Sequence, residues 1–352
     1  MKIAQQIKAL FLLLTLEEQK KLLEELPKSP FNIHRIEVPK DIKCCVHCDS
    51  ENIIKHSMYK NTQRYKCKSC GRTFLPTTGT LTYQIKKPNE FALYASIVEK
   101  EGLLTIAQMA ERVGVSIPTS FEWRHKILLS VPKKKDKFFD ETQMDDLWFL
   151  YSQKGRKGLK YPRKRGGSKR RGDNNYQVKI LAASDKKQVE MKVAKIGRIS
   201  AQDIIHAVGD KFKKDTKLVT DSHRSYQAFA KEAKLKHIKF DAKKHKAETG
   251  ENVQYINNLA GRLGTWLNRE LRGVSTKYLQ LYASYFAYKE KNIIEINKQT
   301  SNTKIWDTYT NIEKMYAKFI ETKSVRTYRC PTKRNRKAQN WNGETVLQYS
   351  YL

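Results

Sequence analysis

The sequence is short of acidic residues relative to basic ones. Asp and Glu together number 36 against 69 Lys and Arg, so the 352-residue chain has a formal net charge of +33 at pH 7. An excess of this size is more than solubility requires and predicts a polyanionic partner, which DNA, RNA or an anionic membrane surface would each provide. A basic protein that is indifferent to DNA is the alternative.

Long hydrophobic runs are also missing. The apolar run "ALFLLL" at residues 9–14 leads directly into the charged stretch "TLEEQKKLLEEL". The run is too short for a secretory leader or a membrane-spanning helix, and no small-residue cleavage site follows it. Six cysteines in 352 residues do not make a disulfide scaffold, and their scarcity fits a reducing compartment. We expect a cytoplasmic, nucleoid-associated protein with a helical segment over residues 1–30, in which Thr15 and Glu18 form a capping box.

Four of the six cysteines form two pairs. Cys45-x2-Cys48 and Cys67-x2-Cys70 are separated by 18 residues, a spacing typical of four-cysteine zinc sites. We predict a zinc ribbon over residues 40–80 that holds one structural Zn²⁺. Whether this lobe contacts DNA or only stabilises itself stays open from the residues alone.

Residues 86–131 have the pattern of a helix-turn-helix DNA-binding region. Thr105 and Gln108 would cap a first helix, Gly114 would make the turn, and Ser116 would cap a second helix. The second helix would enter a major groove. The side chains expected to contact DNA there are Thr119, Ser120, Glu122 and Arg124. A plain pair of helices inside a larger fold is the alternative.

The stretch from residue 138 to residue 290 alternates strand-like and helix-like segments. Asp145 lies in a strand-forming run, Asp221 follows the apolar pair Leu218–Val219, and Asn257 lies in a helical pattern. The segments expected between them are two strands (Val178–Ala183 and Val189–Ile196), a helix from about Ser200, a helix around Tyr226–Ala233 and a short strand (His237–Phe240). This order predicts a ribonuclease-H-like α/β domain.

In such a domain two acidic side chains at neighbouring strand ends meet one group from a helix, and together they can hold one or two hard divalent cations. Asp140 or Glu141 is a rival to Asp145 as the first carboxylate. Asp146 should point to the opposite face of the same strand and have a structural role. Asp221 has the alternative of capping a helix, and Asn257 that of an ordinary helix-surface residue.

This region carries a series of motifs in a fixed order. They are Asp145 followed by aromatic and apolar residues and Lys154–Gly155, "RKRGG" (163–167), "GRIS" (197–200), "TDSHRSY" (220–226), "QYINN" (254–258) with Arg262–Leu263, and "GVSTKYLQLY" (273–282). Through them roughly residues 1–290 resemble the bacterial insertion-sequence transposases of the ISXO type, which join a zinc ribbon to a DDE-like catalytic domain.

The resemblance implies that Asp145, Asp221 and Asn257 are the catalytic residues and bind two Mg²⁺ or Mn²⁺ ions, in the subgroup whose third member is Asn. It implies a DNA transposase that binds terminal inverted repeats, cleaves DNA, and transfers the strand into target DNA as a homodimer or higher oligomer. The chain departs from the family pattern at Gly264, where a Lys is frequent, and at Asn252, where a His is frequent. A catalytically inactive, domesticated DNA-binding regulator is therefore the alternative function, and a simple Mg²⁺-dependent nuclease is a second one.

Basic residues concentrate between Lys154 and Arg171, a segment with ten Lys and Arg and no acid. We expect it to order on a phosphate backbone, with a merely solvated loop as the alternative. The residues predicted to bind DNA here are Lys154, Arg156, Arg163, Lys164, Arg165, Lys169, Arg170 and Arg171, with Arg262 beside the catalytic helix. Arg262 and Lys246 are candidates for the positive charge missing at Gly264.

The expected protein thus has several domains of the α+β and α/β classes. They are an N-terminal helical segment (1–30), the zinc ribbon (40–80), the helix-turn-helix region (86–131), the ribonuclease-H-like catalytic domain (138–290) and a basic helical C-terminal tail of unknown role (291–352).

Overall fold

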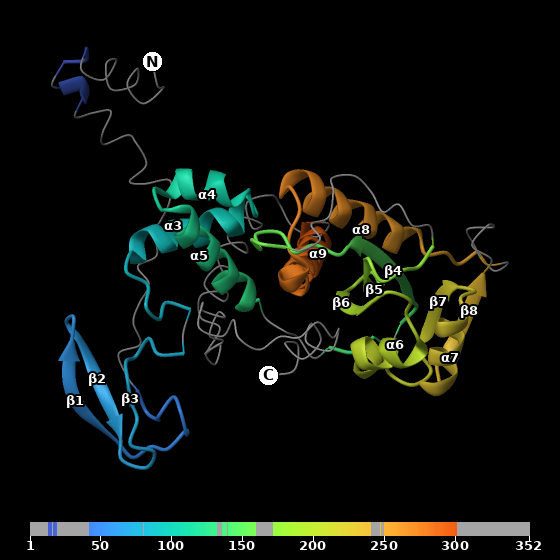
Figure 1. Ribbon diagram of the computed structural model, residues 1–352, viewed down its shortest axis with the longest axis horizontal. Helices are drawn as coiled ribbons and strands as arrows, with labels where there is room; N and C mark the ends of the chain where they lie inside the picture. The colour runs from blue at the N-terminus through green and yellow to red at the C-terminus, as the bar shows by residue number, and fades with distance from the viewer. Residues whose placement is uncertain are drawn as a thin grey trace. The chain divides into compact units, whose positions relative to one another are not determined.

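A computed structural model describes residues 13–15, 17–19, 42–79, 81–131, 136–138, 140–159, 172–240, 247 and 250–300 (Figure 1). The chain divides into two compact units. The first comprises Met1–Thr78, Thr82–Leu103 and Met109–Ser116, and the second comprises the remaining residues. The C-terminal tail beyond residue 300 and most of the N-terminal segment lie outside the described residues, although Thr15 and Glu18 do form the predicted capping box.

The first unit contains a small antiparallel sheet and a helix. Strands β1 (Ile53–Tyr59), β2 (Thr62–Cys67) and β3 (Thr73–Phe74) pair in the order β1-β2-β3. Lys60 and Asn61, with φ of 45° and 61°, form the two-residue turn between β1 and β2, as in the turns that best match strand twist. Helix α3 (Pro88–Lys100) begins with Pro at its first turn and buries an apolar face.

Helices α4 (Ile106–Val113) and α5 (Ile117–Leu129) follow at the positions that the helix-turn-helix pattern predicts. The backbone N–H of Gln108 donates to Thr105 Oγ1, and the Gln108 side chain accepts from Thr105, which is the predicted cap of α4. Gly114 has φ of +72° between the two helices, a conformation that costs glycine little. Their boundaries confirm the predicted helices, whereas a DNA-binding role for the pair remains a prediction.

The second unit is built on a five-stranded sheet in the order β6-β5-β4-β7-β8. Its strands are β4 (Thr142–Leu150), β5 (Gln177–Ser184), β6 (Val189–Ile196), β7 (Lys217–Asp221) and β8 (Lys236–Phe240). Strand β5 runs antiparallel to β4 and β6, while β7 is parallel to both β4 and β8. This mixed α/β order agrees with the arrangement that the sequence predicts.

Helices lie on both sides of this sheet (Figure 1). Helix α6 (Ala201–Val208) packs against β5 and β6, and α7 (Arg224–Glu232) against β7 and β8. Helix α8 (Gln254–Thr265) lies on the opposite side, against β4 and β5. The sequence begins α6 with Ser200 and Asp203, which form a capping box.

The remaining helical segments of the described chain connect these elements. A 3-10 turn, η1 (Gly209–Lys211), follows α6, a π-helical turn, η2 (Trp266–Glu270), continues α8, and a 3-10 turn, η3 (Thr276–Tyr278), precedes α9 (Leu279–Thr300). Helix α9 lies along β6, where the Gln280 side chain bonds to the backbone of Val193 and Met191. No helix in the described part of the chain is both long and apolar enough to cross a membrane.

Candidate metal centre and nucleic-acid interface

Asp145 and Asp221 lie on neighbouring parallel strands. Strands β4 and β7 pair with Thr142 beside Leu218 and Gln143 beside Val219. Two residues further along each strand, this register places Asp145 level with Asp221. Adjacent strands are about 4.8 Å apart, so the register brings the two predicted carboxylates together.

Both carboxylates belong to the face of the sheet that α8 covers. Met144 and Leu218 are buried in the core cluster beneath α6 and α7. Val219 is buried in another cluster with Val253, the residue just before α8. Because side chains alternate between the two faces of a strand, Asp145 and Asp221 lie on the same face as Val219.

Asp145 is in an environment that disfavours its negative charge. The pKa of Asp145 is raised to about 7, chiefly by burial and also by the charges of Asp146 and Asp221, although the backbone N–H of Asp146 donates to Asp145 Oδ1 at 2.8 Å and opposes the shift. A divalent cation relieves such repulsion, and carboxylate oxygens are the ligands that Mg²⁺ and Mn²⁺ prefer. The donor set therefore fits a hard divalent cation.

Asn257 is exposed on α8, the helix that covers this face. In the described part of the chain its side chain makes no hydrogen bond with Asp145 or Asp221. Asn257 therefore lies on the helix that covers the two carboxylates but does not bond to them. Asn252 accepts a hydrogen bond from the backbone N–H of Gln254 at 3.0 Å and so supports the start of α8. A Cβ atom at Gly264 would meet nothing within 4 Å.

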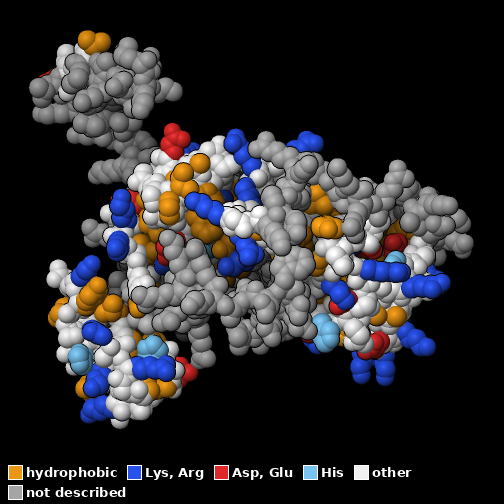
Figure 2. Space-filling view, in the orientation of Figure 1, with side chains coloured by type: hydrophobic (Ala, Val, Ile, Leu, Met, Phe, Trp, Pro, Cys, Tyr) orange, Lys and Arg blue, Asp and Glu red, His pale blue; other side chains and the backbone are white. Residues whose placement is uncertain are grey.

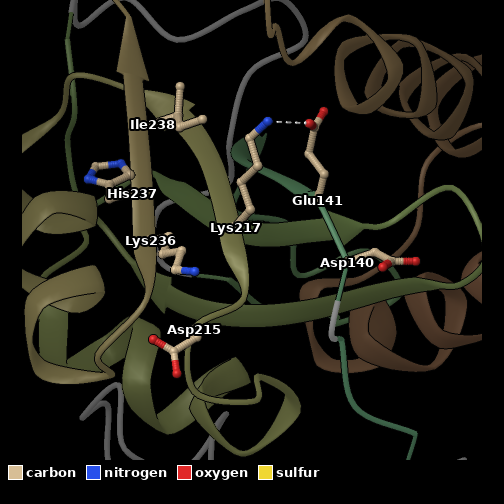
Figure 3. A pocket seen from close by; sticks show the side chains of 7 residues that line it. All are labelled: Asp140, Glu141, Asp215, Lys217, Lys236, His237 and Ile238. Atoms are coloured by element: carbon tan, nitrogen blue, oxygen red, sulfur yellow. Dashed lines mark hydrogen bonds and ion pairs between the residues drawn. The ribbon is translucent and has the colours of Figure 1, made fainter.

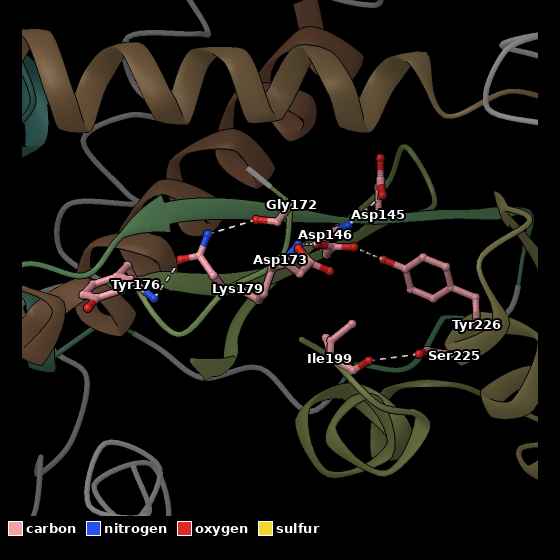
Figure 4. A network of polar contacts seen from close by, with 10 residues as sticks. Asp145, Asp146, Gly172, Asp173, Tyr176, Lys179, Ile199, Ser225 and Tyr226 are labelled. Atoms are coloured by element: carbon pink, nitrogen blue, oxygen red, sulfur yellow. Dashed lines mark hydrogen bonds and ion pairs between the residues drawn. The ribbon is translucent and has the colours of Figure 1, made fainter. Parts of the chain in front are cut away.

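Asp146 has the structural role that strand alternation predicts. Figure 4 shows it on the other side of β4 from Asp145, in a buried polar network. Its carboxylate accepts from Tyr226 Oη at 3.0 Å and from Lys179 Nζ at 2.7 Å. Lys179, whose side chain is only 7% exposed, also pairs with Asp173 at 2.7 Å. Sequence reasoning missed this network, although Lys179 was visible as a charged residue inside an otherwise apolar strand.

The rival carboxylates lie at the other end of β4 and are engaged elsewhere. Asp140 pairs with Lys187, and Glu141 pairs with Lys217 at 2.9 Å. A pocket of about 590 Å³ opens beside them and is lined by Asp140, Glu141, Asp215, Lys217, Lys236, His237 and Ile238 (Figure 3). It lies at the ends where β4, β7 and β8 begin, away from Asp145 and Asp221.

His223 caps the helix that follows Asp221. Its backbone N–H donates to Asp221 Oδ1 at 3.0 Å, and its Nδ1 accepts from the N–H of Ser225 at 3.4 Å. The first bond helps to orient the Asp221 carboxylate.

The four paired cysteines form a cluster in the first unit. The Sγ atoms of Cys45 and Cys70 are 3.7 Å apart, those of Cys48 and Cys67 are 3.6 Å apart, and all four lie within 4.8 Å of one another. A tetrahedral zinc ion with Zn–S bonds of ~2.3 Å separates its sulfurs by roughly 3.8 Å. The cluster fits one structural Zn²⁺.

Two of the predicted DNA contacts on α5 require correction. Ser120 is fully buried and donates to the carbonyl oxygen of Ile106 at 3.0 Å, and Arg124 is 2% exposed and donates to the carbonyl oxygen of Leu104. Both side chains satisfy backbone carbonyls inside the protein, so neither reaches a DNA surface. Thr119 is half-buried and Glu122 is exposed, which leaves their predicted contacts untested.

The predicted basic contacts fall into three groups. Arg156 is exposed, whereas Lys154 donates to the carbonyl oxygens of Arg272 and Gly273, both at 2.7 Å. Arg262 forms a two-point ion pair with Glu290 of α9, at 2.9 and 2.8 Å. The residues that lie outside the described chain are Arg163, Lys164, Arg165, Lys169, Arg170, Arg171 and Lys246.

Comparison with known proteins supports the resemblance. Residues 139–291 match the model of the family described as the ISXO2-like transposase domain. A protein from Halobacterium salinarum, described as an uncharacterized protein in transposable element ISH50, is 24% identical over 185 residues, which are 52% of this chain and 63% of the relative. The chain thus spans less than two thirds of that relative's length. The predicted ISXO-type resemblance is confirmed, whereas its bacterial origin stays a prediction.

Solved structures of transposase complexes show weaker likeness. The Mos1 transposase paired-end complex with left transposon end is 15% identical, with 60% of this chain and 79% of that chain covered and a TM-score of 0.22. The Mos1 mariner paired end complex with Mn is 13% identical, with coverage of 66% and 79% and a TM-score of 0.22. Scores at this level carry no inference, and the fold described above rests on the strand order of this chain.

Proposed function

We propose that this chain, whose residues 139–291 match the ISXO2-like transposase domain, is a DNA transposase of an insertion sequence. It binds the terminal inverted repeats of its element, cleaves a DNA strand at the element's end and joins that end to target DNA. The observation that carries this proposal is the level pair of Asp145 and Asp221 on parallel strands β4 and β7, on the face that α8 covers.

Asp145, Asp221 and Asn257 would hold two Mg²⁺ or Mn²⁺ ions. When bound, such ions supply activation of the attacking water or 3′-hydroxyl and stabilisation of the leaving oxygen. The protein's own residues orient the ligands: the N–H of Asp146 bonds to Asp145 Oδ1, and the N–H of His223 bonds to Asp221 Oδ1. Asn257 contributes a neutral amide oxygen, so the negative charge of the site comes from the two aspartates.

The excess of positive charge supports DNA as the partner. Figure 2 shows Lys and Arg side chains over the visible face of both units, with few acidic side chains among them. Arg156 is exposed, and in the sequence the Lys154–Arg171 segment begins four residues after the end of β4, the strand that carries Asp145. We infer that this segment binds the DNA backbone, that the zinc-bound ribbon and the α4–α5 pair recognise the repeats, and that two or more copies act together on paired ends.

A strand-transfer assay tests the proposal. Purified protein is mixed with labelled duplexes that carry the flanking repeats, a plasmid target and Mg²⁺ or Mn²⁺, beside the variants Asp221→Asn and Asp145→Asn. The exposed Asp140, whose partner Lys187 lies in the turn between β5 and β6, supplies the control Asp140→Asn. Joined products from the parent and the control, but from neither site variant, are expected.

The departures at Gly264 and Asn252 favour one second function, a DNA-binding regulator without catalysis. It predicts tight binding to the repeats that Asp221→Asn leaves unchanged, and no cleavage by any variant. Cleaved but never joined strands would instead identify a divalent-metal-dependent nuclease. Either result would overturn the transposase proposal.

A further inference from the structure

Lys217 forms ion pairs with two carboxylates from different parts of the second unit. Its Nζ lies 2.9 Å from Glu141 Oε2 and 2.7 Å from Glu251 Oε1. Figure 3 shows the Lys217–Glu141 contact at the side of the pocket. Glu251 is the more buried of the two carboxylates, with 13% of its side chain exposed against 37% for Glu141. One ammonium group therefore joins three separate segments of chain.

These three segments are the ones that carry the proposed metal ligands. Glu141 stands four residues before Asp145, Lys217 four residues before Asp221, and Glu251 six residues before Asn257. One residue back from the Thr142–Leu218 pair, the strand register places Glu141 level with Lys217.

The two level pairs share one face of the sheet, because an even number of residues separates them on each strand. Gln143 and Val219 lie between the pairs on this face and are almost fully buried. The ion-pair cluster and the carboxylate pair are thus the two ends of one packed layer, about 13 Å apart along the strands.

We propose that Lys217, with Glu141 and Glu251, is a positioning residue that sets the register of β4, β7 and the segment leading into α8, and so holds Asp145, Asp221 and Asn257 at the spacing that binds divalent metal. The inference rests on the proposed function for the identity of the ligands. Its physical basis is that Coulomb attraction at one end of the layer resists sliding of β7 against β4, while the Glu251 contact fixes the chain before α8 begins.

The sign of the effect on metal affinity separates positioning from simple electrostatics. Removal of a positive charge about 13 Å from a cation site would strengthen cation binding slightly, and salt with a Debye length of about 8 Å would screen most of that gain. Loss of positioning acts in the opposite direction. Loss of groups that orient metal ligands typically weakens metal binding by about 10–100-fold, and we expect about tenfold here because Lys217 is partly exposed.

The test is a titration of the full-length protein with Tb³⁺, followed by luminescence excited through the tyrosines, of which Tyr226 bonds at 3.0 Å to Asp146, the neighbour of Asp145. The variants are Lys217→Met, the conservative Lys217→Arg and Asp221→Asn, which identifies the signal of the site. Lys195→Met is the matched control, because it breaks an exposed pair with Asp203 that joins none of the three segments. Thermal melting of each variant runs in parallel.

We expect Lys217→Met to bind Tb³⁺ about tenfold more weakly, Lys217→Arg to bind within about twofold of the parent, and Lys195→Met to be unchanged. A Lys217→Met protein that melts at a lower temperature but binds Tb³⁺ as the parent does would refute the inference, and so would tighter binding. If Lys217→Met does not fold, the Tb³⁺ affinity of Glu251→Gln provides the same test. The expected loss of affinity is smaller, because the ion pair between Lys217 and Glu141 remains.

The Tb³⁺ titration needs no DNA, so its result is independent of strand transfer. If the parent protein binds Tb³⁺ at Asp221 but never joins strands, the proposed function is refuted and the positioning role is retained. A parent protein that joins strands while Lys217→Met keeps full Tb³⁺ affinity would do the reverse.

Discussion

Replacement of Lys179 with Met should destabilise the second unit strongly. Lys179 Nζ lies 2.7 Å from both Asp146 and Asp173, and its side chain is 7% exposed. Met matches the length of the aliphatic stem but leaves the two carboxylates without their cation, and Asp146 is only 18% exposed. Removal of one partner from a buried ion pair typically costs 3–5 kcal/mol, and we expect about 3 kcal/mol here because Asp173 can turn toward water.

For a unit of this size, ~3 kcal/mol corresponds to a decrease in melting temperature of roughly 6–12 °C. Thermal melting followed by circular dichroism measures it, with Lys187→Met as the control. Lys187 forms an exposed pair with Asp140, and surface pairs contribute about 0–1 kcal/mol. Addition of Asp146→Asn to Lys179→Met should recover part of the loss, because it removes a stranded charge. A shift no larger than that of the control would refute the buried network.

Three further predictions concern other parts of the chain. Burial lowers the pKa of His125 to about 4, so the unfolded chain takes up a proton at a higher pH than the folded chain does. The free energy of unfolding should therefore decrease as pH falls from about 6.5 to 4, by up to ~3 kcal/mol. The melting temperature should depend less steeply on pH in His125→Phe than in the parent, and equal slopes would contradict the assignment. Cys67→Ser should abolish retention of the single zinc ion measured by elemental analysis, whereas Cys44→Ser, at an exposed cysteine outside the cluster, should keep it. A Cβ atom at Gly264 has open space around it, so Gly264→Lys should stabilise α8 by about 0.5 kcal/mol. The new Lys should also contact about one DNA phosphate and so steepen the dependence of DNA affinity on salt concentration. An unchanged slope would show that position 264 faces away from DNA.

Local sequence patterns predicted the elements of this protein well. Thr105 and Ser200 begin helices because their hydroxyl oxygens accept backbone N–H groups within one turn, and such contacts depend only on neighbouring residues. The paired cysteines are similarly local, and they assemble as their spacing indicates. The alternation of Asp145 and Asp146 also placed these two side chains on opposite faces of β4.

Contacts between distant segments could not be predicted in this way. Arg124 was expected at the surface because Arg usually is, yet it is buried against a backbone carbonyl of the segment before α4. Lys179 bonds to Asp146 and Lys217 bonds to Glu251, and the two residues of each pair are more than 30 positions apart in the sequence. Nothing in their sequence neighbourhoods specifies those partners, since strand register decides them. The level placement of Asp145 and Asp221 is likewise a product of register, and it was expected beforehand only through the fold that the order of elements and the family resemblance indicated.

The two outer strands of the five-stranded sheet have consequences for how copies of this protein can meet. The amide side chain of Gln280 occupies backbone groups of β6, and β8 at the other end carries the exposed Lys236 and Lys239. An occupied edge and a lysine-bearing edge both oppose the addition of a strand from another molecule. Copies of this protein therefore resist aggregation through the edges of their five-stranded sheets, and any self-association would have to use other surfaces.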